Sequence, residues 1–389
     1  MSDTASLVNS VLSVQNVEYR RLGDVATIVR GKGLQKKDFT ESGVGCIHYG
    51  QIYTSFGPYT EKTLTFVNPD DVPKFTTVSK GDIIMAVTGE NSEDICKAVA
   101  WLGVEDIVTG GHSAVIKHCL DPKYLSYYFQ SEAFFQQKKA LAHGTKVIEV
   151  TPSDLEDVLI PVPSMEVQRA IVEILDQFSH LLTNISGEVP LRDDQLITYS
   201  QIVLSSDFIR TFGLEPTVCN LSEVAKVTTG DRVTKSEIRN DVGYPVMSGG
   251  VTPMGYYSNY NREANTVTVV RYGSAGFVNW IDTKFWANDV CYTMECSDKV
   301  IPRYLYYALK VNEKYLYSIR TNAIPSHLQR EDLESLQIFV PDIQTQQKIV
   351  NLLDSFHKLA LVRRNELRDR LAQFEYYRDL ILSFGGIKS

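Results

Sequence analysis

The chain has 389 residues, of which 43% are hydrophobic and 22% charged, and its formal net charge is −8. These proportions are typical of a globular protein and argue against intrinsic disorder, while the length predicts two to three domains. No apolar run approaches the roughly 18 residues of a membrane span and no secretory signal is recognisable, so we expect a cytoplasmic protein that makes no membrane contact.

A polar lead-in (residues 1–17) is followed by a first predicted globular block, residues 18–163. Apolar or alternating runs at 82–89, 98–103 and 113–118 predict strands. Asp121 and Pro122 are a typical N-cap and first helical residue, so we expect one helix through residues 123–142. A small helix beginning near Thr151 and a closing strand at 159–163 are predicted to complete the block.

A long helix is predicted next, in residues 164–212, with Ser164 as its cap. Steps of four and three residues from Ile171 to Val203 visit ten positions, nine of them apolar or aromatic. Such a heptad seam needs a partner helix of equal length. Gly187 and Pro190 interrupt the pattern, and we expect a kink or short break there.

The rest of the chain repeats this order, with a second block at 217–341 and a second helix at 342–389, capped by Asp342. Residues 167–178 return as 345–356, and residues 22–31 return as 221–230. The strand at 265–273, the helix at 301–309 and the closing strand at 336–341 match those of the first block. The second seam runs from Ile349 to Ile381 with eight of ten positions apolar or aromatic.

These patterns predict an α/β (α+β) protein with an internal pseudo-twofold repeat. Two globular domains are expected to be separated by a pair of long antiparallel coiled-coil helices, because the chain must come back to place its second block. The predicted helix-pairing positions are Ile171, Leu175, Phe178, Leu182, Ile349, Leu353, Phe356, Phe374, Tyr377 and Ile381. Two similar surfaces at a set distance suit two-part recognition better than one catalytic cleft.

The sequence carries no positive sign of catalysis. It has no GxxxxGK[ST] phosphate loop, and no Asn-Pro-Pro or Asp-Pro-Pro motif of the kind that amino-methyltransferases use. The six cysteines form no CxxC pair, so neither a disulfide framework nor a zinc site is expected. His112 and His118 have no counterparts in the second copy, and we interpret them as scattered polar or core residues. We therefore predict no catalytic residue, no metal site and no cofactor bound by this chain.

The chain resembles the specificity (S) subunit of type I restriction–modification enzymes over nearly its whole length. The resemblance rests on RGKGLQKKDF (30–39), IHYGQIYTSFGPY (47–59), SGGVTPMGYY (248–257) and QFEYYRDLILSF (373–384), together with the repeat. It implies that each block is a target recognition domain that reads one half of a split DNA sequence. It also implies that the helices form a spacer and dock two methyltransferase (modification) subunits, and that motor/nuclease (restriction) subunits join the complex. S-adenosylmethionine would then belong to the modification subunit, and ATP and Mg to the motor subunit.

Candidate DNA contacts in the first block lie in its glycine-containing loops, because side chains on loops can reach base edges and phosphates. Lys36 and Lys37 suit phosphates, and the amide of Gln51 matches adenine. The candidates in this block are Arg30, Lys32, Gln35, Lys36, Lys37, His48, Tyr49, Gln51 and Lys146.

The second block offers the corresponding loops and one strand end. Arg271 could pair with guanine, although an arginine beside a tyrosine is as often a structural stack. The candidates here are Thr229, Asp231, Arg232, Lys235, Ser248, Arg271, Tyr272, Ser274, Arg320 and Asn322.

Two other interpretations remain open. The chain could be a fused or fragmentary DNA methyltransferase–specificity protein, which would methylate DNA alone. It could also be a protein-binding scaffold whose blocks grip protein partners, in which case no DNA sequence would be selected. The acidic net charge is unusual for a protein that binds nucleic acid on its own, and it leaves room for a basic partner.

Overall fold

The computed structural model describes residues 11, 13, 17–144, 147–211, 217–239 and 242–384. The chain divides into two compact units, one made of Met1–Ile185 and Glu366–Ser389 and the other of Ser186–Asn365. Each unit contains one globular block together with a part of both long helices. A contiguous block in the sequence is therefore completed by a helix segment from the other half of the chain.

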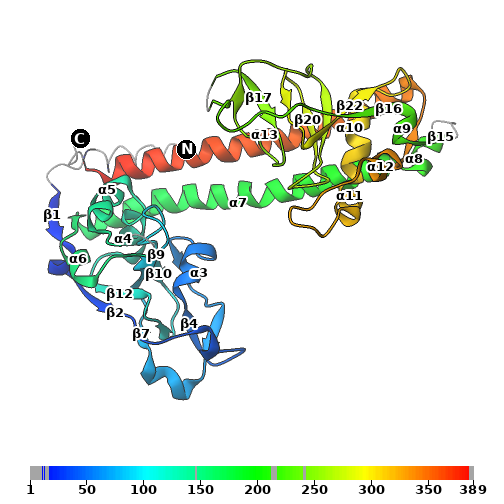
Figure 1. The fold of residues 1–389 in the computed structure, drawn as a ribbon. Coiled ribbons are helices and arrows are strands. Elements are labelled where there is room, and N and C mark those ends of the chain that lie inside the picture. The colour runs from blue at the N-terminus through cyan, green and yellow to red at the C-terminus, as the bar shows by residue number, and fades with distance from the viewer. Residues whose placement is uncertain are drawn as a thin grey trace. The chain divides into compact units, whose positions relative to one another are not determined.

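The first block is built on two five-stranded sheets (Figure 1). Strands β8 and β10 are buried along their whole length, as their unbroken apolar sequences predict. The first sheet consists, in order, of β2 (Ala26–Arg30), β12 (Ser113–His118), β8 (Ile83–Ala86), β10 (Ala98–Trp101) and β5 (Tyr59–Thr60). The second consists, in order, of β3 (Phe39–Thr40), β6 (Thr65–Val67), β4 (Val44–Ile47), β11 (Ile107–Thr109) and β7 (Thr76–Val78). The three strands predicted at 82–89, 98–103 and 113–118 are confirmed.

Two short ladders and several short helices complete the first block. Strand β1 (Glu18–Arg21) pairs with β14 (Leu159–Val162), and β9 (Thr88–Gly89) pairs with β13 (Ile148–Glu149). The helices are α2 (Leu22–Val25), η1 (Lys36–Asp38), α3 (Tyr49–Thr54), η2 (Pro69–Lys74), α4 (Pro122–Tyr128), α5 (Glu132–Leu141) and α6 (Pro152–Glu156). The small helix predicted at Thr151 is confirmed, since Thr151 caps α6 with a reciprocal capping box.

The second block has a four-stranded and a three-stranded sheet. The first contains, in order, β16 (Ala225–Thr229), β22 (Cys291–Cys296), β19 (Thr266–Val270) and β20 (Val278–Ile281). The second contains, in order, β18 (Tyr256–Tyr257), β17 (Tyr244–Met247) and β21 (Trp286–Ala287), and a separate ladder pairs β15 (Thr217–Asn220) with β23 (Gln337–Val340). The short helices are α8 (Ser206–Arg210), α9 (Leu221–Val224), α10 (Pro302–Val311), α11 (Glu313–Ile319) and α12 (Arg330–Glu334).

The main sheets of the two blocks share one strand order, so the predicted internal repeat is confirmed. The strand order β2-β12-β8-β10 returns as β16-β22-β19-β20, and the ladder β1-β14 returns as β15-β23. Each block also has its own hydrophobic core, which includes the buried tyrosines of α4 in the first block and of α10 in the second. The repeat is therefore a repeat of folded units, each able to bury its own apolar surface.

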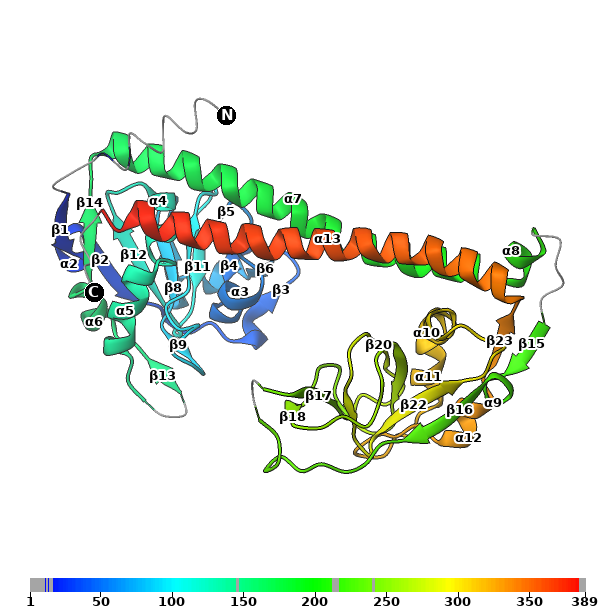
Figure 2. The same ribbon diagram turned by 90° about the horizontal axis from the view of Figure 1, so that it is seen from above.

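The two long helices, α7 (Met165–Val203) and α13 (Ile343–Leu382), run antiparallel, as predicted (Figures 1 and 2). In the first unit Phe178 stacks on Tyr377, with ring centroids 5.8 Å apart. In the second unit Tyr199 stacks on Phe356 at 4.7 Å. The second pair lies 21 residues further along α7 and 21 residues earlier along α13, which is the register of an antiparallel pair. Within the described residues, no helix is long and apolar enough to cross a membrane.

The predicted pairing positions near the helix ends also contact the globular blocks. Ile171, Leu175, Phe374 and Ile381 are buried in the core of the first unit, with Phe178 and Leu182 at its edge. Ile349 and Leu353 are buried in the core of the second unit. One apolar stripe therefore packs against both the partner helix and a sheet-containing block.

Two expectations about helix continuity need correction. Of the kink or short break expected at Gly187 and Pro190, the break is absent, since α7 continues through both residues. Ser186 and Pro190 are exposed, so water can bind the Ser186 carbonyl that proline leaves without an amide donor. The single helix expected at 123–142 is instead two helices, because Ser131 Oγ accepts from the Phe134 amide and donates to the Tyr128 carbonyl, which starts α5 afresh.

A buried glutamine joins each block to the start of its long helix. Gln168 accepts from the Asp121 amide at 2.8 Å and donates to the Pro163 carbonyl at 2.9 Å. Gln346 accepts from the Ile301 amide at 2.8 Å and donates to the carbonyls of Lys299 and Pro341 at 2.9 and 2.7 Å. The same side chain thus satisfies the same backbone groups in both copies.

A second repeated contact lies about two helical turns further along each long helix. Tyr127 and Lys123 of α4 hydrogen-bond to Asp176 of α7, at 2.8 and 2.7 Å. In the second unit Tyr307 and Arg303 of α10 contact Asp354 of α13 at 2.6 and 2.7 Å. These half-buried, charge-assisted bonds restrict rotation of each block on its helix.

Candidate nucleic-acid interface

The predicted phosphate-binding lysines lie in the loop that follows β2 and in η1. Lys32, Lys36 and Lys37 are exposed, and no acidic side chain among the described residues lies within ion-pair distance of them. Gln35 is exposed too, and it is the N-cap of η1, where its backbone amide donates to the Asp38 carboxylate at 2.7 Å. The loop therefore presents three free ammonium groups to solvent.

His48, Tyr49 and Gln51 surround the N-terminus of α3. The His48 ring nitrogen Nδ1 accepts from the Gly50 amide, and the Gln51 side chain accepts from the His48 amide at 2.9 Å. Gln51 Nε2 also donates to Thr65 Oγ1 at 3.2 Å. Both ends of the Gln51 amide therefore have partners inside the chain, and the structure places this residue as a helix cap.

Aromatic rings from three elements meet beside this cap. Tyr49 lies between His48 and His112, with centroid distances of 4.4 and 4.8 Å, and Phe39 meets His48 edge-on at 5.8 Å. Burial, followed by the nearby His112 and Lys36, lowers the pKa of His48 below its ordinary value. The cluster is thus a surface of aromatic rings near Lys36, in which the neutral form of His48 is favoured.

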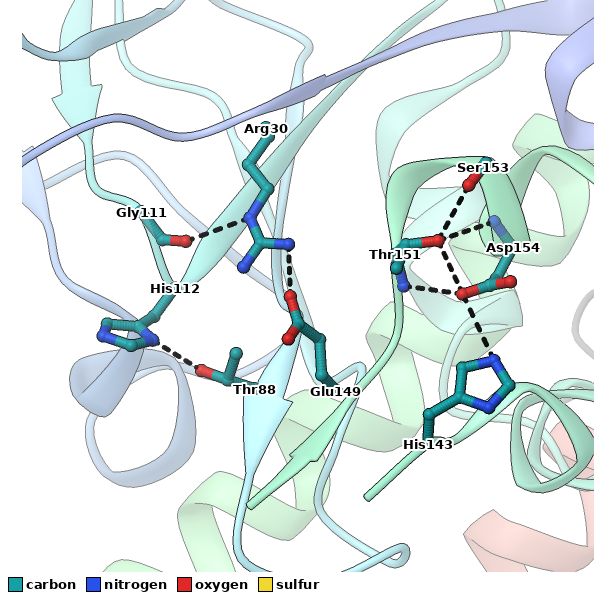
Figure 3. A network of polar contacts seen from close by, with 9 residues as sticks. All are labelled: Arg30, Thr88, Gly111, His112, His143, Glu149, Thr151, Ser153 and Asp154. Carbon is teal, nitrogen blue, oxygen red and sulfur yellow. Dashed lines mark hydrogen bonds and ion pairs between the residues drawn. The ribbon is translucent and has the colours of Figure 1, made fainter.

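His112 and Arg30 belong to a polar network around the β9–β13 ladder (Figure 3). His112 is exposed, and its Nδ1 lies 2.9 Å from Thr88 Oγ1. Arg30 at the end of β2 donates to the Gly111 carbonyl at 3.3 Å and forms a short ion pair with Glu149. The Arg30 guanidinium thus holds Glu149 of β13 and the Gly111 turn together.

The other half of this network caps α6. Thr151 Oγ1 contacts Asp154 at 2.6 Å and Ser153 at 2.8 Å, and His143 lies 3.7 Å from Asp154 (Figure 3). These contacts tie down both sides of the loop that contains Lys146. Lys146 itself lies outside the described residues.

In the second block, the loop after β16 holds the first group of candidates. Arg232 and Lys235 are exposed. Asp231 is also exposed and accepts from Asn261 at 3.2 Å, while the Thr229 carbonyl accepts from Arg262 at 2.8 Å. Arg232 and Lys235 are therefore the predicted phosphate contacts of this loop, and both are exposed.

The structure brings three further predicted segments of this block together. The Ser274 amide donates to the Gly249 carbonyl at 2.9 Å, which places Ser248 beside the 271–274 strand end. The Gly273 amide donates to the Ser326 carbonyl at 3.1 Å, which adds the loop that starts at Arg320. A Cβ atom at Gly249 would lie 2.6 Å from the Tyr272 carbonyl, so this close approach needs glycine. Arg320 and Asn322 are exposed on that loop.

Arg271 and Tyr272 form a stack with a residue that the sequence did not single out. Tyr272 stacks on His327 at 5.2 Å with ring planes 23° apart, and the Arg271 guanidinium lies 4.9 Å from the Tyr272 ring centroid. The Arg271 Nε is buried without a hydrogen-bond partner among the described residues. The His327 Nδ1 lies 2.9 Å from Thr321 Oγ1.

The strand ends of the two blocks share a backbone but carry different side chains. The Val87 amide donates to the His112 carbonyl and the Val150 amide to the Val87 carbonyl; Arg271, Val290 and Leu328 repeat both bonds. By this match, Thr88 of the first block is equivalent to Tyr272 of the second, Glu149 is equivalent to His327, and His112 is equivalent to Val290. By contrast, the junction residues Gln168/Gln346 and Asp176/Asp354 are identical. The scaffold is thus repeated while its tips differ.

These groups are suited to hydrogen bonding and stacking. Burial raises the pKa of Cys96 and of Cys291 to about 12, so these thiols stay protonated and are poor nucleophiles. In the described part of the chain, no group of three or more His, Cys, Asp or Glu side chains could hold a metal ion. Polar groups and aromatic rings on loops are typical of surfaces that bind a ligand.

Sequence reasoning passed over His112 and His327. It set His112 aside because the second copy lacks a histidine at that place. His112 contacts Thr88 and Tyr49 only because β12 pairs with β8, and a local sequence pattern does not show which strands pair. The available signal was that His112 directly precedes a predicted strand, where side chains at strand ends tend to reach solvent.

The chain is similar to known proteins in sequence and in fold. The sequence matches the family described as "Type I restriction modification DNA specificity domain" twice, over residues 15–190 and 215–369. A type I restriction enzyme specificity subunit of Haemophilus influenzae is 22% identical over 415 residues, covering 99% of this chain and 100% of the relative. A type I specificity subunit of Mycoplasma pneumoniae is 26% identical and covers 59% of this chain and 94% of its own length. A crystal structure of a type I restriction-modification system S subunit from M. genitalium shares the fold, with a TM-score of 0.60 and 18% identity, covering 95% of this chain and 97% of that chain.

Proposed function

Because the chain belongs to the family of type I restriction–modification specificity subunits, we propose that it selects a split DNA sequence, each block reading one half. Residues 18–163 and 217–341 are the two target recognition domains, and residues 164–212 and 342–389 are the spacer helices. The observation that carries the proposal is the repeated backbone with different side chains at its matching strand ends. Two copies of one scaffold then read two different half-sites.

In this proposal, affinity and specificity come from different residues. Lys32, Lys36, Lys37, Arg232 and Lys235 contact phosphates, which fix position without reading sequence. Base reading is left to the ring clusters at Tyr49 and Tyr272 and to the loop at Arg320 and Asn322. Arg30 and Gln51 orient these elements from within the chain.

The protein acts without catalysing a reaction itself. Two methyltransferase subunits dock on the spacer helices and carry S-adenosylmethionine, and motor/nuclease subunits carry ATP and Mg. Two platforms related by the repeat support two equivalent docking sites. The net charge of −8 also fits a protein whose partners supply most of the attraction to DNA.

Mapping modified bases in the host genome, with and without this gene, tests the proposal. We expect a split motif to lose methylation when the gene is deleted and to regain it when the gene is restored. A purified chain that methylates DNA alone would point to a fused methyltransferase instead. If the assembled complex enriched no DNA sequence, a protein-binding scaffold would be the better explanation.

A further inference from the structure

Each block holds one histidine ring between a threonine hydroxyl and a tyrosine ring. In the first block His112 Nδ1 lies 2.9 Å from Thr88 Oγ1, and the His112 ring packs on Tyr49 at 4.8 Å. In the second block His327 Nδ1 lies 2.9 Å from Thr321 Oγ1, and the His327 ring stacks on Tyr272 at 5.2 Å. The two arrangements use the same three residue types at the tip of each block.

Duplication alone does not account for this likeness. By backbone hydrogen bonds, His112 corresponds to Val290, whereas His327 corresponds to Glu149. Thr88 is a strand residue of β9, but Thr321 lies in the loop before α12. The same arrangement has therefore been built from non-equivalent positions, as expected when one chemical task is performed in two different sequence contexts.

Each threonine hydroxyl shares one hydrogen bond with a histidine ring nitrogen. Thr88 Oγ1 and His112 Nδ1 are each other's partners among the described residues, and either atom can be the donor. The Thr321 oxygen accepts from the His327 amide at 3.1 Å and shares a second hydrogen bond with His327 Nδ1, in which either atom can donate. A neutral ring that accepts at Nδ1 carries its hydrogen on Nε2. Figure 3 shows the second ring nitrogen of His112 pointing away from the network.

We infer that His112 and His327 are base-reading residues, one in each half of the recognition surface. Each presents an Nε2–H donor to an acceptor on the major-groove edge of a purine, where guanine offers O6 and N7 and adenine offers N7. Thr88 and Thr321 are positioning residues that hold the donor tautomer, and Tyr49 and Tyr272 hold the ring plane. This inference rests on the proposed function, since it names the chemistry by which the same surfaces read DNA.

The test uses the complete complex with its methyltransferase subunits and measures methylation across a library of split targets. In His112→Ala we expect roughly a 10-fold or greater loss at one purine of the first half-site, because one mismatched contact typically costs that much. The preferences in the second half-site should stay as in the wild type. His327→Ala should give the reciprocal result.

Threonine variants separate reading from mere packing. Thr88→Val keeps the size of this buried residue but removes the hydroxyl, so it should broaden preference at the same purine position. Thr88→Ser restores the hydroxyl and should restore the preference. Lys32→Ala is the matched control, because loss of a phosphate contact should weaken all targets alike.

The outcomes distinguish this inference from the function on which it rests. If the wild-type complex enriches no split sequence, the proposed function fails. If the wild type is selective but His112→Ala lowers methylation equally at every sequence, or Thr88→Val and Thr88→Ser behave alike, the base-reading role is wrong. His112→Gln serves as a second variant, and circular dichroism confirms that each variant is folded.

Discussion

The buried glutamine at the start of α13 offers a sharp test of how the second block is held on its helix. Gln346 is fully buried and bonds to the Ile301 amide and to the carbonyls of Lys299 and Pro341. Gln346→Leu nearly preserves the volume but removes all three hydrogen bonds. Lys299 is exposed, so water can bind its carbonyl, whereas Pro341 is buried and Ile301 half-buried.

The expected cost follows from these two groups. A buried donor or acceptor left unsatisfied costs about 1–3 kcal/mol, so Gln346→Leu should destabilise the second unit by roughly 2–5 kcal/mol. At about 1.4 kcal/mol per tenfold change, this speeds amide exchange by about 30-fold to several thousand-fold in that unit. Gln347→Leu is the matched control, because Gln347 is the next residue along the helix, is exposed, and bonds only to Asn351 among the described residues. It should change stability by no more than about 0.5 kcal/mol.

Hydrogen exchange followed by mass spectrometry reads the two units in one experiment. Peptides from β19 and β22 should exchange faster in Gln346→Leu, while peptides from β8 and β12 should not. Gln168→Leu should give the reverse pattern with an effect of similar size, because Gln168 satisfies the two matching groups, the Asp121 amide and the Pro163 carbonyl. Exchange in Gln346→Leu within twofold of Gln347→Leu would refute the reasoning that these glutamines join block to helix.

Three further predictions address pH, modularity and the helices. Burial lowers the pKa of His118 from 6.5 to about 4. As pH falls through this window the unfolded chain takes up a proton before the folded chain does, so the free energy of unfolding declines by up to about 3 kcal/mol. His118→Asn can still accept from the Leu120 amide, and it should flatten the slope of the free energy of unfolding in urea against pH between 6.5 and 4. Replacing residues 217–341 with another block of the family should change one half of the methylated motif and keep the other half and the gap, as methylome mapping would reveal; loss of both halves would contradict independent reading. Inserting four residues after Leu182 adds about 6 Å at one helical turn, so the gap should lengthen by about one or two base pairs; an unchanged gap at full activity would mean that the helices serve only for docking.

Local patterns in the sequence were enough to predict the repeated architecture. The copy of residues 167–178 at 345–356 and the heptad steps from Ile171 and Ile349 depend on apolar spacing alone, and spacing survives without knowledge of tertiary contacts. Helix starts at Pro122 and Thr151 were likewise predictable, because capping is a contact between residues two or three apart. The basic loop at Lys32, Lys36 and Lys37 could be located from the sequence, but whether acidic side chains pair with these lysines could not be predicted.

Tertiary structure decided what local patterns could not. Pro190 reads as a helix breaker, yet α7 continues because that face is exposed to water and the helix is held by contacts on its other side. Gln51 reads as an adenine contact, yet its amide is occupied by His48 and Thr65. Tyr49, Thr88 and His112 lie far apart in the sequence, and only the pairing of β8 with β12 and the packing of α3 on β8 bring them together. The sequence by itself determined that the chain is a duplicated pair of globular blocks with two long helices. Tertiary contacts decided which side chains of the predicted loops keep their polar groups unoccupied, because a side chain's availability depends on neighbours that are remote along the chain.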